Sequence, residues 1–350
     1  MTDSVLHVAE TVKGGVATVL NQLLKSDVES FCLIPRAQRD SIESSYSSVN
    51  YFGGSSRGIV LLIKMMLSSL VLLKKKKPKV VHLHSSFALL LAPIVWVYNK
   101  RIKIIYQPHG VFYDSDIPRS KIKIYLIKAI EKTLVLFVHK IVSISNHEKY
   151  LIDQLHGHEK VFLLRNAVEP SNLKFDLNRN RDSFLFVGRL DEQKGIDELI
   201  KVWRHRDETL HVVGDSVRSD FNKKSLPNII FHGWVSPKEL DGFYANAKAV
   251  IVPSRWEGFG LVVIEAFRNG TPVISSERGA LPELVHDDLS GYTFVFNKID
   301  KELPVILNKF KDKRDLEIMS QYCFDFYKSE FRVFDYIKKY ESLVKELMKT

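Results

Sequence analysis

The sequence predicts an α/β protein of two domains, each built on a parallel sheet. Its 350 residues exceed the usual size of one domain. Short apolar runs alternate with amphipathic stretches in both halves, which is typical of parallel strands joined by helices. A polar stretch, Asn172–Asp182, separates the two series and is interpreted as a linker. The apolar content of 45% suffices for two ordinary cores.

In the first half, Gly14-Gly15 follows the first apolar run and begins a helix that extends to about Leu24. Two further apolar segments, Ile59–Leu73 and Phe87–Tyr98, contain 15 and 12 residues, fewer than the roughly 20 that span a bilayer. Packed helices are expected there, and the alternative for the first is to lie on a membrane surface. The predicted strands are Val5–Ala9, Phe31–Ile34, Val80–His84, Lys103–Tyr106, Lys140–Ser145 and Val161–Leu164.

The second half repeats this alternation after the polar stretch. Its chain beyond about Asp300 is predicted to be helical. The predicted strands are Ser183–Gly188, Leu210–Gly214, Ile229–Gly233, Ala249–Val252 and Pro272–Ser275. Strands and helices in this order favour a second doubly wound α/β domain.

Two cysteines, Cys32 and Cys323, stand far apart in the sequence, so no disulfide framework is expected. A reducing cytoplasm fits this usage. No basic segment leads into an apolar one at the start, which argues against a signal peptide. A cytoplasmic location is therefore expected, with peripheral attachment to the inner face of the plasma membrane as a possibility.

The net charge of +10 lies wholly in the first half. Residues 1–170 carry 23 Lys and Arg against 13 Asp and Glu, whereas residues 171–350 carry 28 of each. Such a one-sided field indicates an anionic partner: a membrane surface, a lipid-linked phosphate or a nucleic acid. The densest cluster is Lys74–Lys77 with Lys79. The alternative is that these lysines only complement the dipole at a helix end.

The most informative motif follows the predicted strand Ala249–Val252. Glu257 and Glu265 stand eight residues apart around the turn Gly258-Phe259-Gly260. The two glycines let the backbone approach a ligand closely. A helix from about Leu261 to Arg268 follows, and its first N–H groups favour an anion such as phosphate. Carboxylates that accept from hydroxyls, beside donors for phosphate, suit a sugar nucleotide.

This stretch resembles the donor-sugar site of family 4 glycosyltransferases, which have the GT-B fold. The resemblance implies two Rossmann-like α/β/α domains that face each other across a cleft. Residues 1–170 would bind the acceptor, and residues 171–330 would bind the nucleotide sugar. Residues 331–350 would form a helix that packs back on the first domain.

A second motif, Gly188-Arg189 followed by Lys194-Gly195, matches the family pattern after the first strand of the second half. The resemblance implies that Arg189 and Lys194 clamp the donor diphosphate and stabilise charge on the leaving nucleotide without a metal. Glu257 would contact the sugar and Glu265 the ribose hydroxyls. The base would stack near His232-Gly233-Trp234.

The same resemblance places His109, in Gln107-Pro108-His109-Gly110, beside the donor sugar. The implied catalytic residues are therefore His109, Arg189, Lys194 and Glu257. The remaining implied donor-binding residues are Gly15, Gly188, Gly214, Gly258, Phe259, Gly260, Leu261 and Glu265. Val213–Ser216 lacks the second glycine common in the family, and Val262 replaces a frequent proline.

No metal and no cofactor besides the nucleotide-sugar substrate are expected. His82 and His84 alternate along a strand and share a side, but a metal site needs further ligands, so packing or cleft lining is the preferred interpretation. The predicted activity is that of a retaining hexosyltransferase acting on a glycan, most simply a lipid-linked one in bacterial surface polysaccharide, lipopolysaccharide or capsule biosynthesis. The alternatives are an epimerase or synthase acting on a soluble substrate, and a non-enzymatic nucleic-acid-binding protein. The complete set of donor-site residues argues against nucleic acid.

Overall fold

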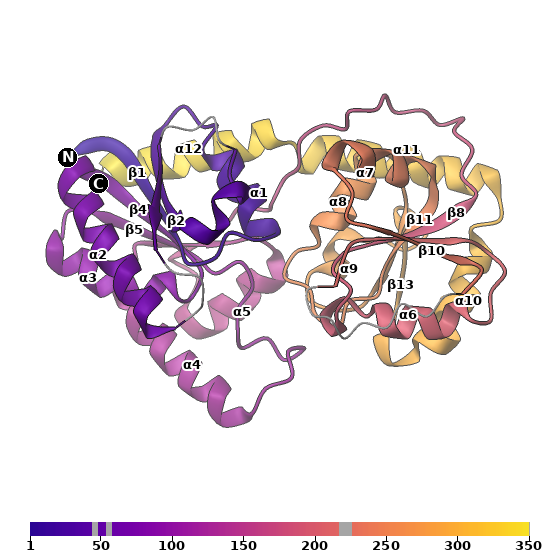
Figure 1. Cartoon of the computed structure of the whole chain (residues 1–350), viewed down its shortest axis with the longest axis horizontal. Coiled ribbons are helices and arrows are strands. Elements are labelled where there is room, and N and C mark those ends of the chain that lie inside the picture. Colours follow the sequence, from indigo (N-terminus) through magenta and orange to yellow (C-terminus); the bar gives the residue numbers. More distant parts are fainter. Residues whose placement is uncertain (44–47, 54–57, 217–225, 350) are drawn as a thin grey trace. The chain divides into compact units, whose positions relative to one another are not determined.

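The computed structural model describes residues 1–43, 48–53, 58–216 and 226–349. The chain divides into two compact units (Figure 1). Unit 1 comprises Met1–Asn166 and Val333–Thr350, and unit 2 comprises Ala167–Arg332. Each unit is an α/β domain with a wholly parallel sheet, as the alternation of apolar runs predicts.

The described residues of unit 1 form a seven-stranded sheet in the order β3-β2-β1-β4-β5-β6-β7. Its strands are β1 (Thr2–Ala9), β2 (Glu29–Pro35), β3 (Val49–Phe52), β4 (Pro78–His84), β5 (Lys103–Gln107), β6 (Lys140–Ser143) and β7 (Val161–Leu163). Its helices are α1 (Gly15–Leu23), η1 (Arg36–Ser41), α2 (Ile59–Lys76), η2 (Ala88–Leu91), α3 (Ala92–Tyr98), α4 (Lys121–Leu134), η3 (Val135–Phe137), α5 (Asn146–His156) and α12 (Val333–Lys349).

The two faces of the unit 1 sheet have different cores. Side chains such as Leu6 and Val81 pack under α2, α3 and α4 in the larger apolar cluster. The opposite face carries Ala9 and Cys32, which pack with α1. Alternate residues along a strand point to opposite faces, so each strand serves both cores.

The last helix, α12, belongs to unit 1 (Figure 1, yellow). The buried carboxylate of Glu341 accepts from the backbone N–H of Asp27 at 2.9 Å. Tyr340, fully buried, lies 3.1 Å through its hydroxyl from Nδ1 of His82 on β4. The helix therefore completes the cover of the sheet face that carries His82.

In the described part of unit 2, six strands form a sheet in the order β10-β9-β8-β11-β12-β13. Its strands are β8 (Ser183–Val187), β9 (Leu210–Val213), β10 (Ile229–Gly233), β11 (Ala247–Val252), β12 (Val273–Ser276) and β13 (Gly291–Phe294). Its helices are η4 (Glu192–Lys194), α6 (Ile196–Trp203), α7 (Pro237–Asn246), α8 (Leu261–Phe267), α9 (Leu281–Leu284), η5 (Phe296–Lys298), α10 (Ile299–Lys309) and α11 (Lys313–Glu330).

The interpretation of Asn172–Asp182 as a linker is wrong. The stretch lies within unit 2. Arg181 is buried and donates to the carbonyl oxygens of Ala247, Asn269 and Gly270 and to Oγ1 of Thr271. The polar character of the stretch gave no sign of this anchor, because a buried arginine whose two terminal nitrogens are hydrogen-bonded cannot be told from an exposed one in sequence.

Two edge strands, β3 and β13, were not predicted, because each has four residues and only a short apolar signal. The strand expected at Lys140–Ser145 ends at Ser143, since Ser145 caps α5 by accepting from the N–H of Glu148. Both apolar segments of the first half are helical, as expected. Among the described residues, no helix combines the length and apolar character that crossing a bilayer requires.

Candidate functional site

The loops that follow the strands of unit 2 meet at the carboxyl edge of its sheet. A Cβ at Gly214, after β9, would lie 1.9 Å from the carbonyl oxygen of Gly188, after β8. A Cβ at Gly279, after β12, would lie 1.9 Å from the carbonyl oxygen of Glu257, after β11. These backbones touch only because both positions are glycines with positive φ. Ligands of open parallel sheets bind at this edge.

Lys194 and Glu257 form an ion pair between the loops after β8 and β11. Lys194 Nζ lies 2.5 Å from Glu257 Oε2, and the side chains are 19% and 12% exposed. The hydroxyl of Ser254 donates to the same carboxylate oxygen at 3.3 Å. Asp191 accepts from the backbone N–H of Lys194 at 3.1 Å and so fixes the turn that carries the lysine. The structure therefore brings two of the predicted catalytic residues together.

Arg189 points along its own loop. Its Nε lies 2.8 Å from Asp191 Oδ2, and its Nη2 donates to Gln193 Oε1 at 2.6 Å. Half of the side chain is exposed. Among the described residues, its guanidinium contacts neither Lys194 nor Glu257, and the diphosphate clamp expected of Arg189 and Lys194 stays a prediction.

A second arginine, Arg255, fixes the loop after β11. Its guanidinium binds both carboxylate oxygens of Asp197 at 2.7 Å and donates to the carbonyl oxygen of Glu192 at 2.6 Å. The backbone N–H of Arg255 also donates to the carbonyl oxygen of Gln193 at 2.8 Å. A bidentate pair of this kind holds planar geometry, so the β11 loop is tied to the loop that carries Lys194.

The turn Gly258-Phe259-Gly260 leads into α8. Gly260 is left-handed at φ 99°, and the helix begins at Leu261 as predicted. Phe259 is buried and packs against Phe331, with ring centroids 6.2 Å apart. Its side chain therefore anchors the turn in the core of unit 2, which leaves its backbone as the part available to a ligand.

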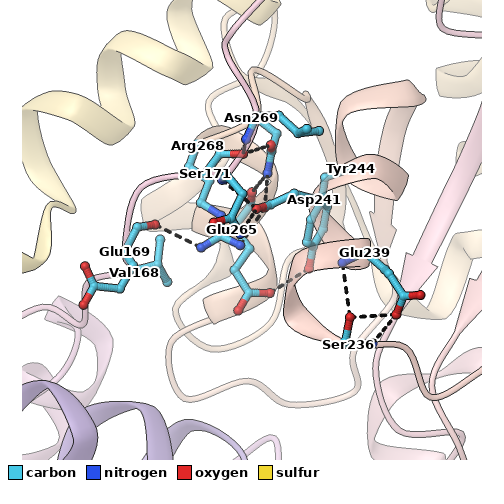
Figure 2. A network of polar contacts seen from close by, with 12 residues as sticks. Val168, Glu169, Ser171, Ser236, Glu239, Asp241, Tyr244, Glu265, Arg268 and Asn269 are labelled. Carbon is cyan, nitrogen blue, oxygen red and sulfur yellow. Dashed lines mark hydrogen bonds and ion pairs between the residues drawn. The ribbon is translucent and has the colours of Figure 1, made fainter.

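Glu265 lies one turn into α8 and is half-buried. The hydroxyl of Tyr244 donates to its Oε2 at 2.7 Å. Burial raises the pKa of Glu265, against the Tyr244 hydrogen bond and the positive charges of Arg268 and Lys194, which lower it. The carboxylate is thus oriented by a neighbour from α7 (Figure 2).

A polar network that sequence reasoning missed holds α8 in place. Asp241 on α7 is fully buried and accepts from Arg268 Nη2 at 2.7 Å and from Asn269 Nδ2 at 3.0 Å. It also accepts from the backbone and side-chain amides of Asn172. Figure 2 shows Arg268 and Asn269 around Asp241, with Glu265 beside them. The sequence holds no local signal for Asp241, because its partners come from two distant segments, Asn172 and Arg268-Asn269.

The loop proposed to hold the base is joined to the loop after β9. Asp215 accepts from the backbone N–H of Trp234 at 3.1 Å, and Gly214 donates to the carbonyl oxygen of Gly233 at 2.8 Å. The Trp234 side chain is largely exposed. The structure thus brings Gly188, Gly214 and the Gly233 turn together at one edge of the sheet.

Two predicted residues belong to unit 1. Gly15 is the first residue of α1, directly after a Gly14 that has positive φ. His109, after β5, has a left-handed backbone at φ 58° and lies 2.9 Å through Nε2 from Nδ1 of His84. Burial lowers the pKa of His109 to about 3, so its imidazole is neutral.

Glu148 fixes the peptide that follows His109. Its Oε1 accepts from the backbone N–H of Gly110 at 2.6 Å, and its Oε2 accepts from that of Ile144 at 2.7 Å. Burial raises the pKa of Glu148 to about 7, although these hydrogen bonds lower it. Sequence reasoning missed this residue, but Ser145 followed three positions later by Glu148 is a recognisable helix-start pattern.

The described residues contain one group of three side chains suited to a metal: His7, His82 and His84, all buried with ligand atoms within 4.8 Å of one another. His7 Nδ1 and His84 Nε2 are hydrogen-bonded to each other at 3.1 Å. His82 Nδ1 is bonded to the Tyr340 hydroxyl. An ion would have to displace these bonds, so the donor set does not form a prepared metal site.

Two protein families match the chain. The family described as Glycosyltransferase Family 4 matches residues 14–172, and the family described as Glycosyl transferases group 1 matches residues 170–322. A protein of Klebsiella pneumoniae described as an uncharacterized 41.2 kDa protein in the cps region is 32% identical, over 98% of this chain and 99% of its own.

A more distant relative is the Escherichia coli UDP-Gal:alpha-D-GlcNAc-diphosphoundecaprenol alpha-1,3-galactosyltransferase. It is 25% identical over 71% of this chain and 70% of its own. The solved structure of Anabaena Alr3699/HepE in complex with UDP and glucose superposes with a TM-score of 0.80 at 16% identity, over 99% of this chain and all of that one.

Fold and families agree. The TM-score of 0.80 over nearly the whole of both chains shows that the two parallel α/β units have the fold of that structure. The two family matches together run from residue 14 to residue 322. The chain belongs to family 4 of the glycosyltransferases and is a transferase enzyme with the GT-B fold.

Proposed function

We propose that this enzyme moves a hexose from a nucleoside-diphosphate donor to a glycan acceptor, with retention of anomeric configuration. The observation that carries the proposal is the Lys194–Glu257 pair, held where the loops of unit 2 meet. The structural neighbour was solved with UDP and glucose, and the Escherichia coli relative is named for a UDP-Gal donor. Both names support a nucleotide sugar as the donor.

In this proposal Lys194 provides a point charge for the donor diphosphate and Glu257 accepts from sugar hydroxyls. The two are paired before the donor arrives, so binding exchanges the Lys194–Glu257 contact for contacts with phosphate and sugar. Arg189, half-exposed, would turn from Asp191 to complete the clamp. The cations then stabilise the leaving diphosphate without a metal. His109 would lie beside the sugar.

The remaining donor contacts in the proposal come from backbone and from one carboxylate. Glu265, oriented by Tyr244, would accept from the ribose hydroxyls. The residues proposed to approach the nucleotide sugar through backbone atoms are Gly15, Gly188, Gly214, Gly258, Phe259, Gly260 and Leu261. Backbone N–H groups and glycine turns give close approach without a side chain in the way.

A thermal-shift panel of UDP-, GDP-, ADP- and dTDP-sugars, with and without EDTA, tests the donor site. We expect one nucleotide class to raise the melting temperature saturably, and EDTA to leave the rise unchanged. Lys194→Ala should abolish the rise, whereas Lys201→Ala, an exposed lysine of α6, should keep it. No rise with any donor would contradict the proposal. Product analysis with donor alone separates a transferase from an epimerase.

We further propose a lipid-linked acceptor and attachment to an anionic membrane surface. The outer helix layer of unit 1, defined as α2, η2, α3, α4 and η3, carries more than half of the large apolar side chains that are exposed in the described residues. On α4 they are Ile122, Tyr125, Leu126 and Ile130, and on α2 they include Val60, Ile63, Leu67 and Val71. Their spacing of three and four residues forms one exposed stripe per helix.

The charge of the same layer favours anionic lipid. Residues 44–113 contain no Asp or Glu, and α4 adds Lys121, Lys123, Lys128 and Lys132. Glu131, the acid of α4, is buried. Apolar stripes flanked by lysines suit a helix that lies in the headgroup region. The names of the two relatives, one in a cps region and one with a diphosphoundecaprenol acceptor, support such a location.

Flotation with phosphatidylcholine vesicles, with and without phosphatidylglycerol, tests this attachment. We expect recovery only with the anionic vesicles, and a loss of at least about tenfold when Tyr125, Leu126 and Ile130 become Ser, because apolar burial is worth over 1 kcal/mol per side chain. Replacing Lys74–Lys77 by Ser should also lower recovery. Val305 and Ile318, exposed on unit 2 helices, give the matched control. Equal loss in that control would contradict the attachment.

A further inference from the structure

Three histidines of unit 1 form a continuous hydrogen-bonded chain, defined here as the histidine chain. His7 Nδ1 lies 3.1 Å from His84 Nε2, and His84 Nδ1 lies 2.9 Å from His109 Nε2. His7 lies on β1, His84 ends β4, and His109 stands two residues after the end of β5. His7 and His84 are fully buried, whereas His109 is half-buried at the carboxyl edge of the sheet.

The protons on this chain are coupled. Burial lowers the pKa of His7 and His109 to about 3, and burial with the neighbouring imidazoles lowers the pKa of His84 well below its usual value. Each ring is therefore neutral near pH 7, with one N–H donor and one accepting nitrogen. Every hydrogen bond needs one of each, so choosing the proton position on one ring fixes the other two.

His7, at the inner end of the histidine chain, decides between the two sets of proton positions that the hydrogen bonds allow. Among the described residues, His7 Nε2 is buried and has no hydrogen-bond partner. If that nitrogen carried the proton, a buried donor would be left without an acceptor, which is rarer and costlier than an unused lone pair. The proton of His7 therefore belongs on Nδ1 and donates to His84 Nε2. His84 must then donate from Nδ1 to His109 Nε2.

We propose that His84 and His7 are positioning residues that hold His109 as the tautomer protonated at Nδ1. His109 then offers an N–H donor at Nδ1 to an oxygen of the ligand, because its Nε2 is occupied by the bond from His84. It acts as a neutral hydrogen-bond donor and not as a base. The assignment of that oxygen to the donor sugar rests on the proposed function, whereas the assignment of the tautomer does not.

Two further contacts fix the same ring. The His84 and His109 rings lie nearly parallel at 19°, with centroids 5.2 Å apart. The Gly110 N–H that follows is held by Glu148 at 2.6 Å. A donor fixed from both the ring side and the backbone side keeps its direction when a ligand binds.

The test reads the ring nitrogens directly, by two-dimensional ¹⁵N–¹H NMR of histidine-labelled full-length protein. We expect His109 and His84 to be protonated at Nδ1. In His84→Leu, His109 should shift to the Nε2 tautomer that free histidine favours, and kcat should fall about tenfold, the worth of one hydrogen bond. His84→Asn, whose amide can still donate to His109, should restore both.

His82→Leu is the matched control. His82 is equally buried, and its ring lies beside that of His84 with centroids 4.0 Å apart and planes tilted by 31°, but it bonds to Tyr340 and lies outside the histidine chain. We expect a loss of stability with the His109 tautomer unchanged. Protonation of wild-type His109 at Nε2, or a stoichiometric metal ion on these rings, would overturn the proposal. Absence of transfer with the expected tautomer would instead contradict the proposed function alone.

Discussion

The Lys194–Glu257 pair allows fold and donor binding to be separated. Its side chains are 19% and 12% exposed, between a surface pair worth up to 1 kcal/mol and a buried pair whose breakage costs 3–5 kcal/mol. We expect Lys194→Met to cost about 2 kcal/mol, because among the described residues the Glu257 carboxylate then keeps only the Ser254 hydroxyl. That corresponds to about 4–8 °C in melting temperature for a domain of this size.

The double variant Lys194→Met/Glu257→Gln should be more stable than Lys194→Met alone, since it leaves no unpaired carboxylate. Urea unfolding of wild type, Lys194→Met, Glu257→Gln and the double variant gives the coupling energy between the two side chains, which we expect at about 1–2 kcal/mol. A saturating nucleoside diphosphate then tests binding: at 100 times Kd it stabilises by about 2.7 kcal/mol.

We expect wild type and Glu257→Gln to show that stabilisation, because the proposal assigns Glu257 to the sugar and not to the phosphates. Both proteins without Lys194 should lose it. Exposed Lys201→Met is the control for loss of a lysine, and it should behave as wild type. Full stabilisation of the double variant by the diphosphate would refute the assignment of Lys194, and zero coupling would refute the importance of the pair to the fold.

Three further predictions concern the frame of the site. Asp241→Ala should lower the free energy of unfolding by about 3–5 kcal/mol, because it leaves the Arg268 guanidinium, 11% exposed, without its carboxylate partner. The control Glu317→Gln breaks an exposed pair and should change the free energy of unfolding in urea by less than about 0.5 kcal/mol. Gly279→Ala should abolish transfer because its Cβ would collide with the Glu257 carbonyl oxygen, and Gly242→Ala in α7, with open space, should remain active; equal activity of both would contradict the loop geometry. The pKa of Glu148 is about 7 in the folded protein against 4.5 in the unfolded chain, so between these pH values the native state holds a proton that the unfolded chain has lost. The free energy of unfolding of wild type, relative to that of Glu148→Gln, should therefore fall by at most about 3 kcal/mol from pH 4.5 to 7. A rise over this range would contradict the shift.

The sequence was sufficient where function depends on local pattern. The glycine turn at Gly258–Gly260, the start of α8 and the strands that carry the loops were predicted from order and spacing alone. The pairing of Lys194 with Glu257 follows the same logic, since both stand at carboxyl ends of neighbouring strands, β8 and β11. Such ends converge in any parallel sheet.

Contacts that join distant segments could not be predicted. Asp241 meets Asn172, Arg268 and Asn269, and nothing near it in sequence distinguishes it from an exposed helix carboxylate. In sequence, nothing distinguishes His7 from the other residues of its apolar strand, because its hydrogen bond to His84 depends on the position of β4 in the sheet. The direction of the Arg189 side chain depends on rotamers, which spacing does not encode.

The central claim is transfer of a sugar from a nucleotide donor, and incorporation of radiolabelled sugar into a lipid-extractable product tests it most directly. Purified enzyme, the donor class selected by thermal shift and a membrane lipid extract are the components. We predict labelled lipid with wild type and with Lys201→Ala, and none with Lys194→Ala. Donor cleaved with the label recovered only as free sugar, or equal labelling by Lys194→Ala, would contradict the account.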